Sequence, residues 1–325
     1  MKVILTGSLA FDYLMKFPGL FKDHILPDHL DKISLSFLVD DMARRAGGVG
    51  SNIAYTLALL GGNSYLYSSA GDDFVDYSHQ LARLGVDVSG VKIVPGQLTA
   101  SFFATTDLSN AQIASFYSGA MAESAHMPLA EADYAPDDFV MVSPSDPRAM
   151  QNYISESAQL GLRMIFDPGQ QVVRADPCIL KDGIFNAYGL FVNDYEFELL
   201  QKCTGLSAEQ ILSYPAFSVV TMGKDGARLY TADENLHVPA VPDVKIVDPT
   251  GVGDAFRAGF LRGYMAGLSL QVCGEMGTIA AAFCIQNDGP QNHFFTWDEF
   301  KSSYRKYFDD RGELEKLNRN NQSLE

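Results

Sequence analysis

Short apolar runs alternate along the chain with stretches whose apolar residues recur at helical spacing. Ser51–Gly62 has the helical pattern and ends at paired glycines, which commonly terminate helices. The runs that indicate buried strands are Lys2–Gly7, Ser64–Gly71, Phe139–Ser143, Arg163–Pro168, Leu190–Asp194 and Phe217–Gly223. Apolar strands separated by amphipathic helices predict an α/β fold with a mostly parallel sheet and helices on both of its faces.

Two segments break this rhythm because their apolar and polar residues alternate. They are Ile33–Asp40 and Leu98–Gly119, and the second contains a turn signal at Asp107–Asn110. Such alternation is typical of β-hairpins in which one face does not pack against the main core. A loop centred on Ser109 places Phe102 directly opposite Phe116, as one aromatic pair on one face. We therefore predict a single domain over residues 1–325 with a small β-sheet inserted from about 13–45 and 96–120.

Composition and charge narrow the class of protein. The 325 residues are 47% hydrophobic, which is enough for a substantial core. No apolar run is long enough to span a membrane, and Asp12 interrupts the N-terminal run, so we expect neither a span nor a signal peptide. The net charge of −16 disfavours nucleic acid and anionic membranes as partners. The charge does not exclude a phosphorylated ligand, because main-chain N–H groups and a bound cation can hold one inside an acidic protein.

The cysteines show neither paired nor metal-binding spacing. Scattered cysteines of this kind indicate reduced, structural thiols, and we expect a cytoplasmic protein. They are Cys178, Cys203, Cys273 and Cys284.

The segment Val247–Phe260, VDPTGVGDAFRAGF, is a glycine-rich turn that leads into a helix and carries a carboxylate, Asp254. It lacks the Gly-Lys-Ser/Thr of a P-loop and the GxGxxG fingerprint of dinucleotide-binding proteins, which argues against a nicotinamide-dependent enzyme. An Asp beside the N–H groups of a helix N-terminus suits a base that takes a proton from an alcohol next to a phosphoryl group. The alternative is an ordinary N-terminal helix residue favoured by the helix dipole.

Three further polar turns lie at presumed strand ends. Gly47–Gly62 is a second glycine-rich turn that leads into a helix. Asn193–Glu196 and Thr221–Ala227 each follow an apolar run. Open α/β sheets bind ligands at the carboxyl ends of their strands, so these turns indicate a ligand site at that edge.

On these motifs the chain resembles the ribokinase-like, or PfkB, family of carbohydrate and nucleoside kinases over nearly its whole length. The motifs on which this resemblance rests are the Gly-Gly…Asn turn at Gly47–Asn52, the Asp-x-Thr-Gly-x-Gly-Asp turn at Asp248–Asp254 and the Asn-x-x-Glu element at Asn193–Glu196. Pro249 and Val252 depart from the residues common in the family. Main-chain N–H groups build the anion hole, so Val252 should be tolerated, and Pro249 precedes the glycines that matter.

The resemblance implies a ribokinase-like three-layer α/β/α sandwich, whose inserted sheet is a lid that closes and excludes water. It implies that Asp254 is the base that activates the acceptor hydroxyl. It also implies that the transferred phosphoryl group is held in an anion hole formed by Gly251, Val252 and Gly253.

The resemblance further implies a bound ATP and Mg²⁺. Asn193 and Glu196 resemble the element that organises metal, water and triphosphate, with Glu196 acting on the metal through water. Thr221 and Gly223 match the nucleotide-side loop. Asp12 and Asn52 match the groups that bind ribose hydroxyls, and Gly47 and Gly48 match the hinge of the lid.

Segments 17–41, 105–121 and 167–174 resemble the bacterial adenosine kinases of this family, notably the actinobacterial type. In that type an aromatic pair from the lid holds the purine, and Phe102 and Phe116 match it. Stacking of a base on an aromatic ring contributes ~1–3 kcal/mol in nucleic-acid systems. Other positions that match substrate-side elements are Ser8, Ser36, Gly48, Gln170, Gln171 and Arg174. The alternative is that the two phenylalanines pack the lid against its own domain or a partner subunit.

The predicted function is ATP-dependent phosphorylation of the 5′-hydroxyl of adenosine, which gives AMP. Alternatives are the same chemistry on ribose or inosine, and a nucleoside-binding protein without turnover. An apolar lid face predicts a homodimer joined through the lids. Gln286–His293 is a candidate either for the adenine end of ATP or for a monovalent-cation loop.

Overall fold

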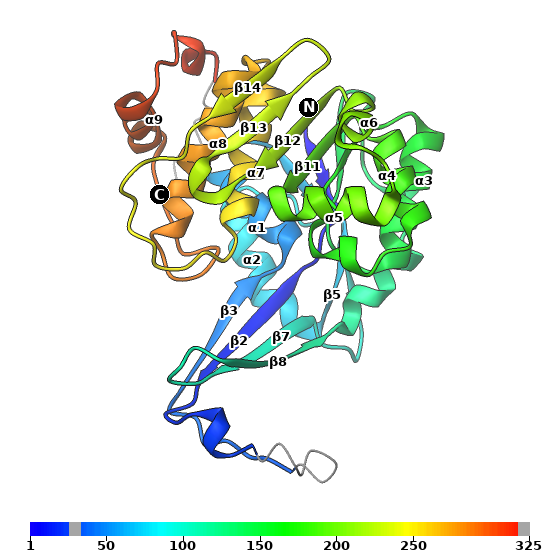
Figure 1. Ribbon diagram of the computed structural model, residues 1–325. Helices are drawn as coiled ribbons and strands as arrows, with labels where there is room; N and C mark the ends of the chain where they lie inside the picture. Colours follow the sequence, from blue (N-terminus) through cyan, green and yellow to red (C-terminus); the bar gives the residue numbers. More distant parts are fainter. Residues whose placement is uncertain (26–33, 318–325) are drawn as a thin grey trace.

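An eight-stranded sheet forms the centre of the molecule, with strand order β14-β13-β12-β11-β10-β9-β1-β4 (Figure 1). The computed structural model describes residues 1–25 and 34–317. Neighbouring strands from β4 to β12 pair in parallel, and β13 and β14 add an antiparallel edge. The bounds are β1 Val3–Leu5, β4 Ser64–Leu66, β9 Phe139–Val142, β10 Arg163–Phe166, β11 Gly189–Asn193, β12 Phe217–Thr221, β13 Ala227–Tyr230 and β14 Asn235–Val238. The predicted, mostly parallel sheet is confirmed.

Helices cover both faces of this sheet, which gives three layers (Figure 1). Alternate strand residues enter two separate cores: Val3 and Leu5 pack on one face and Ile4 on the other. The first face carries α1 Val49–Leu59, α2 Val75–Arg83, α7 Val252–Met265, α8 Leu270–Ile285 and α9 Trp297–Tyr307. The second face carries α3 Pro147–Leu160, α4 Pro177–Asn186, α5 Asp194–Thr204 and α6 Ala208–Ser213.

The apolar run Ser64–Gly71 forms two strands instead of the single strand expected. Its first half is β4, and its second half, β5 (Ser68–Gly71), pairs in parallel with β6 (Val91–Val94). The run is buried throughout, so its composition gave no sign that it passes from one sheet to another.

A second, four-stranded sheet projects from the sandwich and is called the lid sheet here (Figure 1). Its strand order is β3-β2-β7-β8. The predicted hairpin is formed by β7 and β8, and their register places Phe102 opposite Phe116, as expected. Register also places Asp12 beside Phe102, so these three side chains share one face of the lid sheet. The bounds are β2 Ala10–Lys16, β3 Asp41–Gly47, β7 Ala100–Thr106 and β8 Gln112–Tyr117.

The expected strand at Ile33–Asp40 is not formed. Residues 34–39 have no regular structure, and Ile33 lies outside the described residues. Phe37 instead packs its ring against Phe17 and Phe21, at 4.9 and 5.0 Å between ring centroids. The apolar positions of this segment serve a small aromatic cluster at the tip of the lid sheet, and pairing begins only at β3.

Two broader expectations concern the environment of the chain. Among the described residues, no helix combines the length and the apolar run that crossing a bilayer requires. The four cysteines are free thiols, as predicted, and Cys273 and Cys284 are buried.

Helices α7 and α8 approach closely at two glycines. A Cβ atom at Gly259 would lie 2.5 Å from the carbonyl oxygen of Met276 and 2.8 Å from the Cα atom of Gly277. Both atoms belong to the backbone of α8 and cannot move aside. This contact sets how closely α7 packs against α8, and the first turn of α7 carries Asp254.

We expect Gly259→Ala to lower the free energy of unfolding by ~1–3 kcal/mol, because overpacking forces the helices apart. The matched control is Gly263→Ala in the same helix, whose Cβ would lie 3.1 Å from the sulfur atoms of Cys273 and Met276 and 3.2 Å from the Cα atom of Cys273, a looser fit than at Gly259. Both variants gain the same helix propensity, so the difference between them isolates the packing term. Equal midpoints in chemical denaturation would contradict the prediction.

Candidate active site

Two glycine-initiated helices meet at the centre of the candidate site. Helix α1 begins after Gly48, with φ +98°, and α7 begins after Gly251, with φ +74°. Residues other than glycine rarely adopt these values. Asn52 in the first turn of α1 donates a hydrogen bond from Nδ2 to Oδ2 of Asp254, at 2.9 Å. The positive ends of two helices therefore converge on one carboxylate.

Asp254 is a buried carboxylate in the first turn of α7, and its side chain is 13% exposed. Burial raises the pKa of Asp254 to about 7, although Arg257 and the hydrogen bond from Asn52 act in the opposite direction. Proton acceptors work best when their pKa lies near the operating pH. A carboxyl in this environment is chemically suited to act as a general base. Its position in the first turn of α7 also agrees with the alternative of a helix N-terminal residue favoured by the helix dipole.

Arg257 and Asp167 form a buried ion pair beside Asp254, which the sequence did not reveal. Nη2 of Arg257 donates to Oδ1 of Asp167 at 2.5 Å, and the Asp167 side chain has no exposure. Burial alone would lower the pKa of Arg257, but Asp167 and Asp254 raise it, so the guanidinium stays charged. The only signal in the sequence was the spacing of three between Asp254 and Arg257, which places both on one helix face.

Asn193 and Glu196 form a capping box at the start of α5. The Asn193 Oδ1 atom accepts the N–H of Glu196 at 2.7 Å, and Glu196 Oε2 accepts the N–H of Asn193 at 2.9 Å. This reciprocal pair satisfies two otherwise free donors and fixes the Glu196 carboxylate. Both residues line a cavity of about 210 Å³ together with Asp167, Gly253, Asp254 and Arg257.

The donor set of this cavity fits Mg²⁺ held mainly by a bound triphosphate. No group of three or more His, Cys, Asp or Glu residues within 1–25 and 34–317 could hold a metal alone. Mg²⁺ commonly keeps several waters and binds through one or two carboxylates plus substrate phosphates. Glu196 offers such a carboxylate, and burial raises its pKa.

A larger cavity of about 790 Å³ opens beside the small one and shares Asn193, Thr221 and Gly253 with it. Thr221 ends β12, and Gly223 begins the following 3₁₀ turn with φ +56°. Apolar side chains make up much of its lining, a surface that suits a flat aromatic ring. They include Val241, Val244, Ile246, Phe256, Ala281 and Ile285.

Asp12, Gly47, Gly48 and Ser8 come together where the lid sheet joins the sandwich. A Cβ atom at Gly47 would lie 2.8 Å from Oδ2 of Asp12, so the glycine leaves room for this carboxylate. Burial raises the pKa of Asp12 to about 6, against the opposing effect of Arg45. Ser8 Oγ accepts the N–H of Val49 at 3.2 Å.

Phe102 and Phe116 lie on the face of the lid sheet that carries Asp12. Phe116 is 51% exposed, as the open side of a binding surface would be. Among the described rings of the lid strands, the stacked pair is Tyr13 with Phe103 on the opposite face, at 4.7 Å. Phe102 and Phe116 are therefore aligned without stacking on each other.

The remaining sequence candidates are dispersed. Gln170 lines the small cavity, and Gln171 donates from Nε2 to the carbonyl oxygen of Ser145 at 3.1 Å. Arg174 and Ser36 are exposed. Arg174 ends the 3₁₀ turn Gly169–Val173, and Ser36 lies near the tip of the lid sheet, so the structure does not bring these two to the other residues.

Arg45 of β3 links the lid sheet to the sandwich, a contact that sequence reasoning also missed. Its guanidinium donates to Asp248 at 3.3 Å and pairs with Asp288. Oδ2 of Asp248 also accepts the N–H of Gly289 at 2.9 Å. Segment 286–293 thus lies where the lid sheet joins the sandwich, and in the described structure none of its residues lines the larger cavity.

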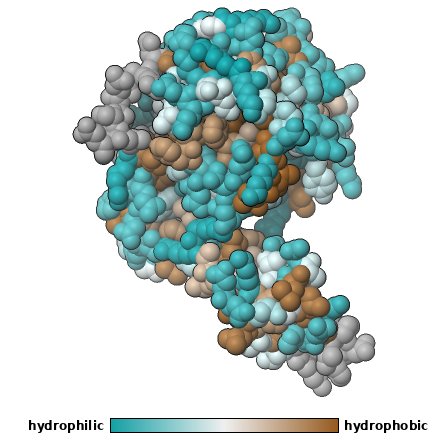
Figure 2. Space-filling view, turned by 90° about the vertical axis from the view of Figure 1, so that its left-hand side faces the viewer, coloured by the Kyte–Doolittle hydropathy of each residue, from teal (hydrophilic) through white to brown (hydrophobic). Residues whose placement is uncertain are grey.

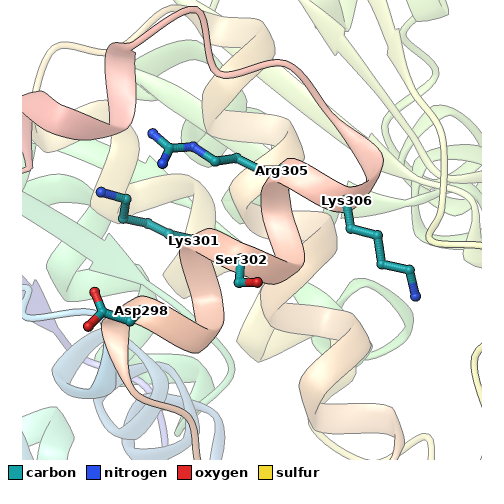
Figure 3. A pocket seen from close by; sticks show the side chains of 5 residues that line it. All are labelled: Asp298, Lys301, Ser302, Arg305 and Lys306. Atoms are coloured by element: carbon teal, nitrogen blue, oxygen red, sulfur yellow. The ribbon is translucent and has the colours of Figure 1, made fainter.

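A separate shallow depression lies on the surface of α9. Figure 3 shows Lys301 and Arg305 extending to one side of the helix and Lys306 to the other. Lys301 and Arg305 both pair with Glu315, each at 2.8 Å. These charges are satisfied within the chain, so the depression is not the candidate site.

We expect Asp254→Asn to raise the melting temperature by a few degrees at pH 8. The pKa of the folded state lies above that of the unfolded state, so ionising Asp254 destabilises the fold as pH rises from about 4 to about 7. The full shift corresponds to at most ~4 kcal/mol. At pH 5 the Asp254 carboxyl is mostly neutral in the folded protein, so the variant's gain in melting temperature should be smaller. Thermal unfolding at both pH values tests this, and an equal gain at both would contradict it.

Comparison with known proteins places the chain in a family. The profile described as "pfkB family carbohydrate kinase" matches residues 19–297. A nucleoside kinase of Methanocaldococcus jannaschii is 28% identical over an alignment of 312 positions that covers 94% of this chain and 97% of that protein. The structure of Burkholderia thailandensis nucleoside kinase in complex with inosine is 36% identical, with a TM-score of 0.83, and covers 94% of this chain and 98% of that chain. A ribokinase of Thermotoga maritima, 22% identical with a TM-score of 0.76, shares the fold.

Two of these relatives are named nucleoside kinases. They support the resemblance to carbohydrate and nucleoside kinases, but not specifically the resemblance to the adenosine-kinase type. The match to the profile, the two motif turns and the ribokinase fold agree with one another. The chain belongs to the pfkB family of carbohydrate kinases.

Proposed function

We propose that the protein transfers the terminal phosphoryl group of ATP to the 5′-hydroxyl of a purine nucleoside, with adenosine as the acceptor and AMP as the product. One observation carries the proposal: Asp254, buried with a pKa near 7, lies where the small cavity meets the turn Gly251–Gly253 and the nucleotide-sized cavity. A base is needed at that junction, between the acceptor hydroxyl and the phosphoryl group.

In the proposed reaction, Asp254 takes the proton of the acceptor hydroxyl as its oxygen attacks the γ-phosphorus. The main-chain N–H groups of Gly251, Val252 and Gly253 stabilise the charge that develops on the phosphoryl oxygens. Bound Mg²⁺ would neutralise the β- and γ-phosphate oxygens and would be held by the phosphates, with Glu196 acting through water. Asn193 fixes that carboxylate through the capping box.

The acceptor is proposed to lie between Asp254 and the lid sheet. Asp12 and Asn52 would bind the ribose hydroxyls, and Phe102 and Phe116 would contact the base from the lid. Thr221 and Gly223 would contact ATP. The other residues proposed for the acceptor side are Ser8, Ser36, Gly47, Gly48, Gln170, Gln171 and Arg174.

Inosine is the second candidate acceptor, and the relative from Burkholderia thailandensis supports it because its structure holds inosine. The exposed ring of Phe116 offers a flat apolar surface, which both purines would use. Ribose, which lacks a base, would leave that surface in water, so the lid favours a nucleoside over a free sugar.

Closure of the lid sheet about Gly47 and Gly48 is proposed to complete the site. Ser36 and Phe116 are exposed in the structure, and they can reach an acceptor only if the lid sheet moves toward the sandwich. Closure would exclude water, which otherwise competes with the acceptor for the phosphoryl group.

A panel of acceptors tests the proposed function. We expect ADP release to be at least tenfold more efficient, in kcat/KM, with adenosine or inosine than with ribose or fructose. Asp254→Asn should lower kcat by ~10²–10⁴-fold, because general-base catalysis contributes that much. A preference for a free sugar would contradict the acceptor. Binding of nucleosides without any turnover would instead indicate a nucleoside-binding protein.

We also propose a homodimer joined through the lid sheets. The face of the lid sheet opposite Asp12 carries Met42, Phe103, Ile113 and Tyr117, which are between 37% and 62% exposed. Figure 2 shows hydrophobic residues exposed among hydrophilic ones on the projecting lid. An exposed apolar sheet face of this kind is an interface or an aggregation hazard.

We expect Ile113→Glu to convert a dimer into a monomer in gel filtration, because a charge would be buried at the interface. Leu160→Glu on α3 is the matched control, since Leu160 is 37% exposed and lies on the sandwich. A wild-type monomer at micromolar concentration would contradict the proposed dimer.

Two further points stay predictions. The free thiols agree with a reducing compartment such as the cytoplasm, where ATP is available. The second is a monovalent cation near segment 286–293. In the structure, Arg45 pairs with Asp248 and Asp288 there, so these two carboxylates already have a cationic partner.

A further inference from the structure

Arg257 places a buried guanidinium directly against the turn proposed to hold the phosphoryl group. Its side chain is 12% exposed, and a Cβ atom at Gly253 would lie 2.7 Å from its Nη1 atom. The missing side chain at Gly253 therefore makes room for the guanidinium at the N-terminus of α7. Any larger residue there would push Arg257 away from the turn.

The hydrogen-bonding capacity of Arg257 is largely unused. A guanidinium has five N–H donors, and the partner found for them is Oδ1 of Asp167. The Nε atom is buried and has no hydrogen-bond partner. Nη1 lies 4.0 Å from Oδ1 of Asp254, which is beyond hydrogen-bond distance. Buried spare donors with a fixed planar geometry are suited to a phosphate.

The charges around the small cavity also call for a cation. Asp167, Glu196 and Asp254 line it with carboxylates, and Arg257 is the one basic residue among its described lining residues. Without Arg257, a triphosphate would enter a cavity whose charged lining side chains are all negative. Asp167 holds the guanidinium in place, and the Asp167 and Asp254 carboxylates keep it charged.

We propose that Arg257 is a catalytic residue that donates N–H groups to the transferred phosphoryl group, and that Asp167 is its positioning residue. This proposal rests on the proposed function and adds the side-chain cation that the glycine-rich turn lacks. As the bond from the acceptor oxygen to the γ-phosphorus forms, the bond to the β–γ bridging oxygen breaks and its electron pair leaves on ADP. The acceptor proton goes to Asp254, and Arg257 neither gains nor loses a proton.

A purely structural role makes a different prediction. If Arg257 only neutralised Asp167, its loss would weaken the fold and leave recognition of the phosphoryl group unchanged. A complex of ADP, aluminium fluoride and acceptor imitates the phosphoryl group in flight, so the gain in affinity over ADP alone reports contacts to that group.

The test uses the full chain with Arg257→Met and Arg257→Lys, and with Arg262→Met as the matched control. Arg262 lies on the same helix, and its Nε donates to the carbonyl oxygen of Leu60 at 2.9 Å, outside the small cavity. Calorimetry gives the affinities for ADP, for the acceptor, and for ADP with aluminium fluoride, Mg²⁺ and acceptor. Turnover is measured with whichever acceptor of the panel the wild type uses.

We expect Arg257→Met to lower kcat by ~10²–10³-fold and to lose the fluoride-dependent gain in affinity. Affinities for ADP and acceptor should stay within about threefold, since their binding does not need the phosphoryl contact. Arg257→Lys should keep part of the gain but lose at least about tenfold in kcat, because an ammonium cannot replace two planar donors. If the methionine variant does not fold, the lysine variant decides.

A gain in affinity that survives in both Arg257 variants, as in Arg262→Met, would overturn the proposal. So would a folded Arg257→Met with kcat within tenfold of the wild type. Failure of the proposed function is a separate outcome, recognised when the wild type turns over no acceptor. The fluoride-dependent affinity still decides the role of Arg257 in that case, because it requires no turnover.

Discussion

The hydrogen bond from Asn52 to Asp254 is the contact on which the rest of the site depends. It joins the first turns of α1 and α7, whose starts each require a glycine with positive φ. The two helix ends share one carboxylate that is largely buried, and this burial raises its pKa. Function is thus tied to a local loss of stability, as is common where a charge must be kept inside a protein.

Everything else is arranged around that carboxylate along one edge of the sheet. Strands β11 and β12 end at Asn193 and Thr221, which lie between the two cavities. On the other side, β2 and β3 bring Asp12 and Arg45 to the joint between the lid sheet and the sandwich. Because Arg45 binds Asp248, six residues before Asp254, the position of the lid sheet is linked to the turn Gly251–Gly253.

Patterning predicted the parts of the structure that depend on local sequence. The parallel sheet followed from its apolar runs, and the register of Phe102 and Phe116 followed from the turn at Asp107–Asn110. Residues 34–39 were mistaken for a strand because alternation cannot tell a sheet face from an aromatic cluster around Phe37. The Asp167–Arg257 pair spans 90 residues, so only the fold brings it together.

The pH dependence of kcat/KM for nucleoside phosphorylation tests the central claim, that Asp254 is the base, most directly. The base must be ionised, so kcat/KM should rise about tenfold per pH unit below pH 7 and level off above it, following the pKa of about 7. In Asp254→Asn the residual rate should lack that rise. A wild-type profile that is flat from pH 5.5 to 8, or a rise that persists in Asp254→Asn, would contradict the account.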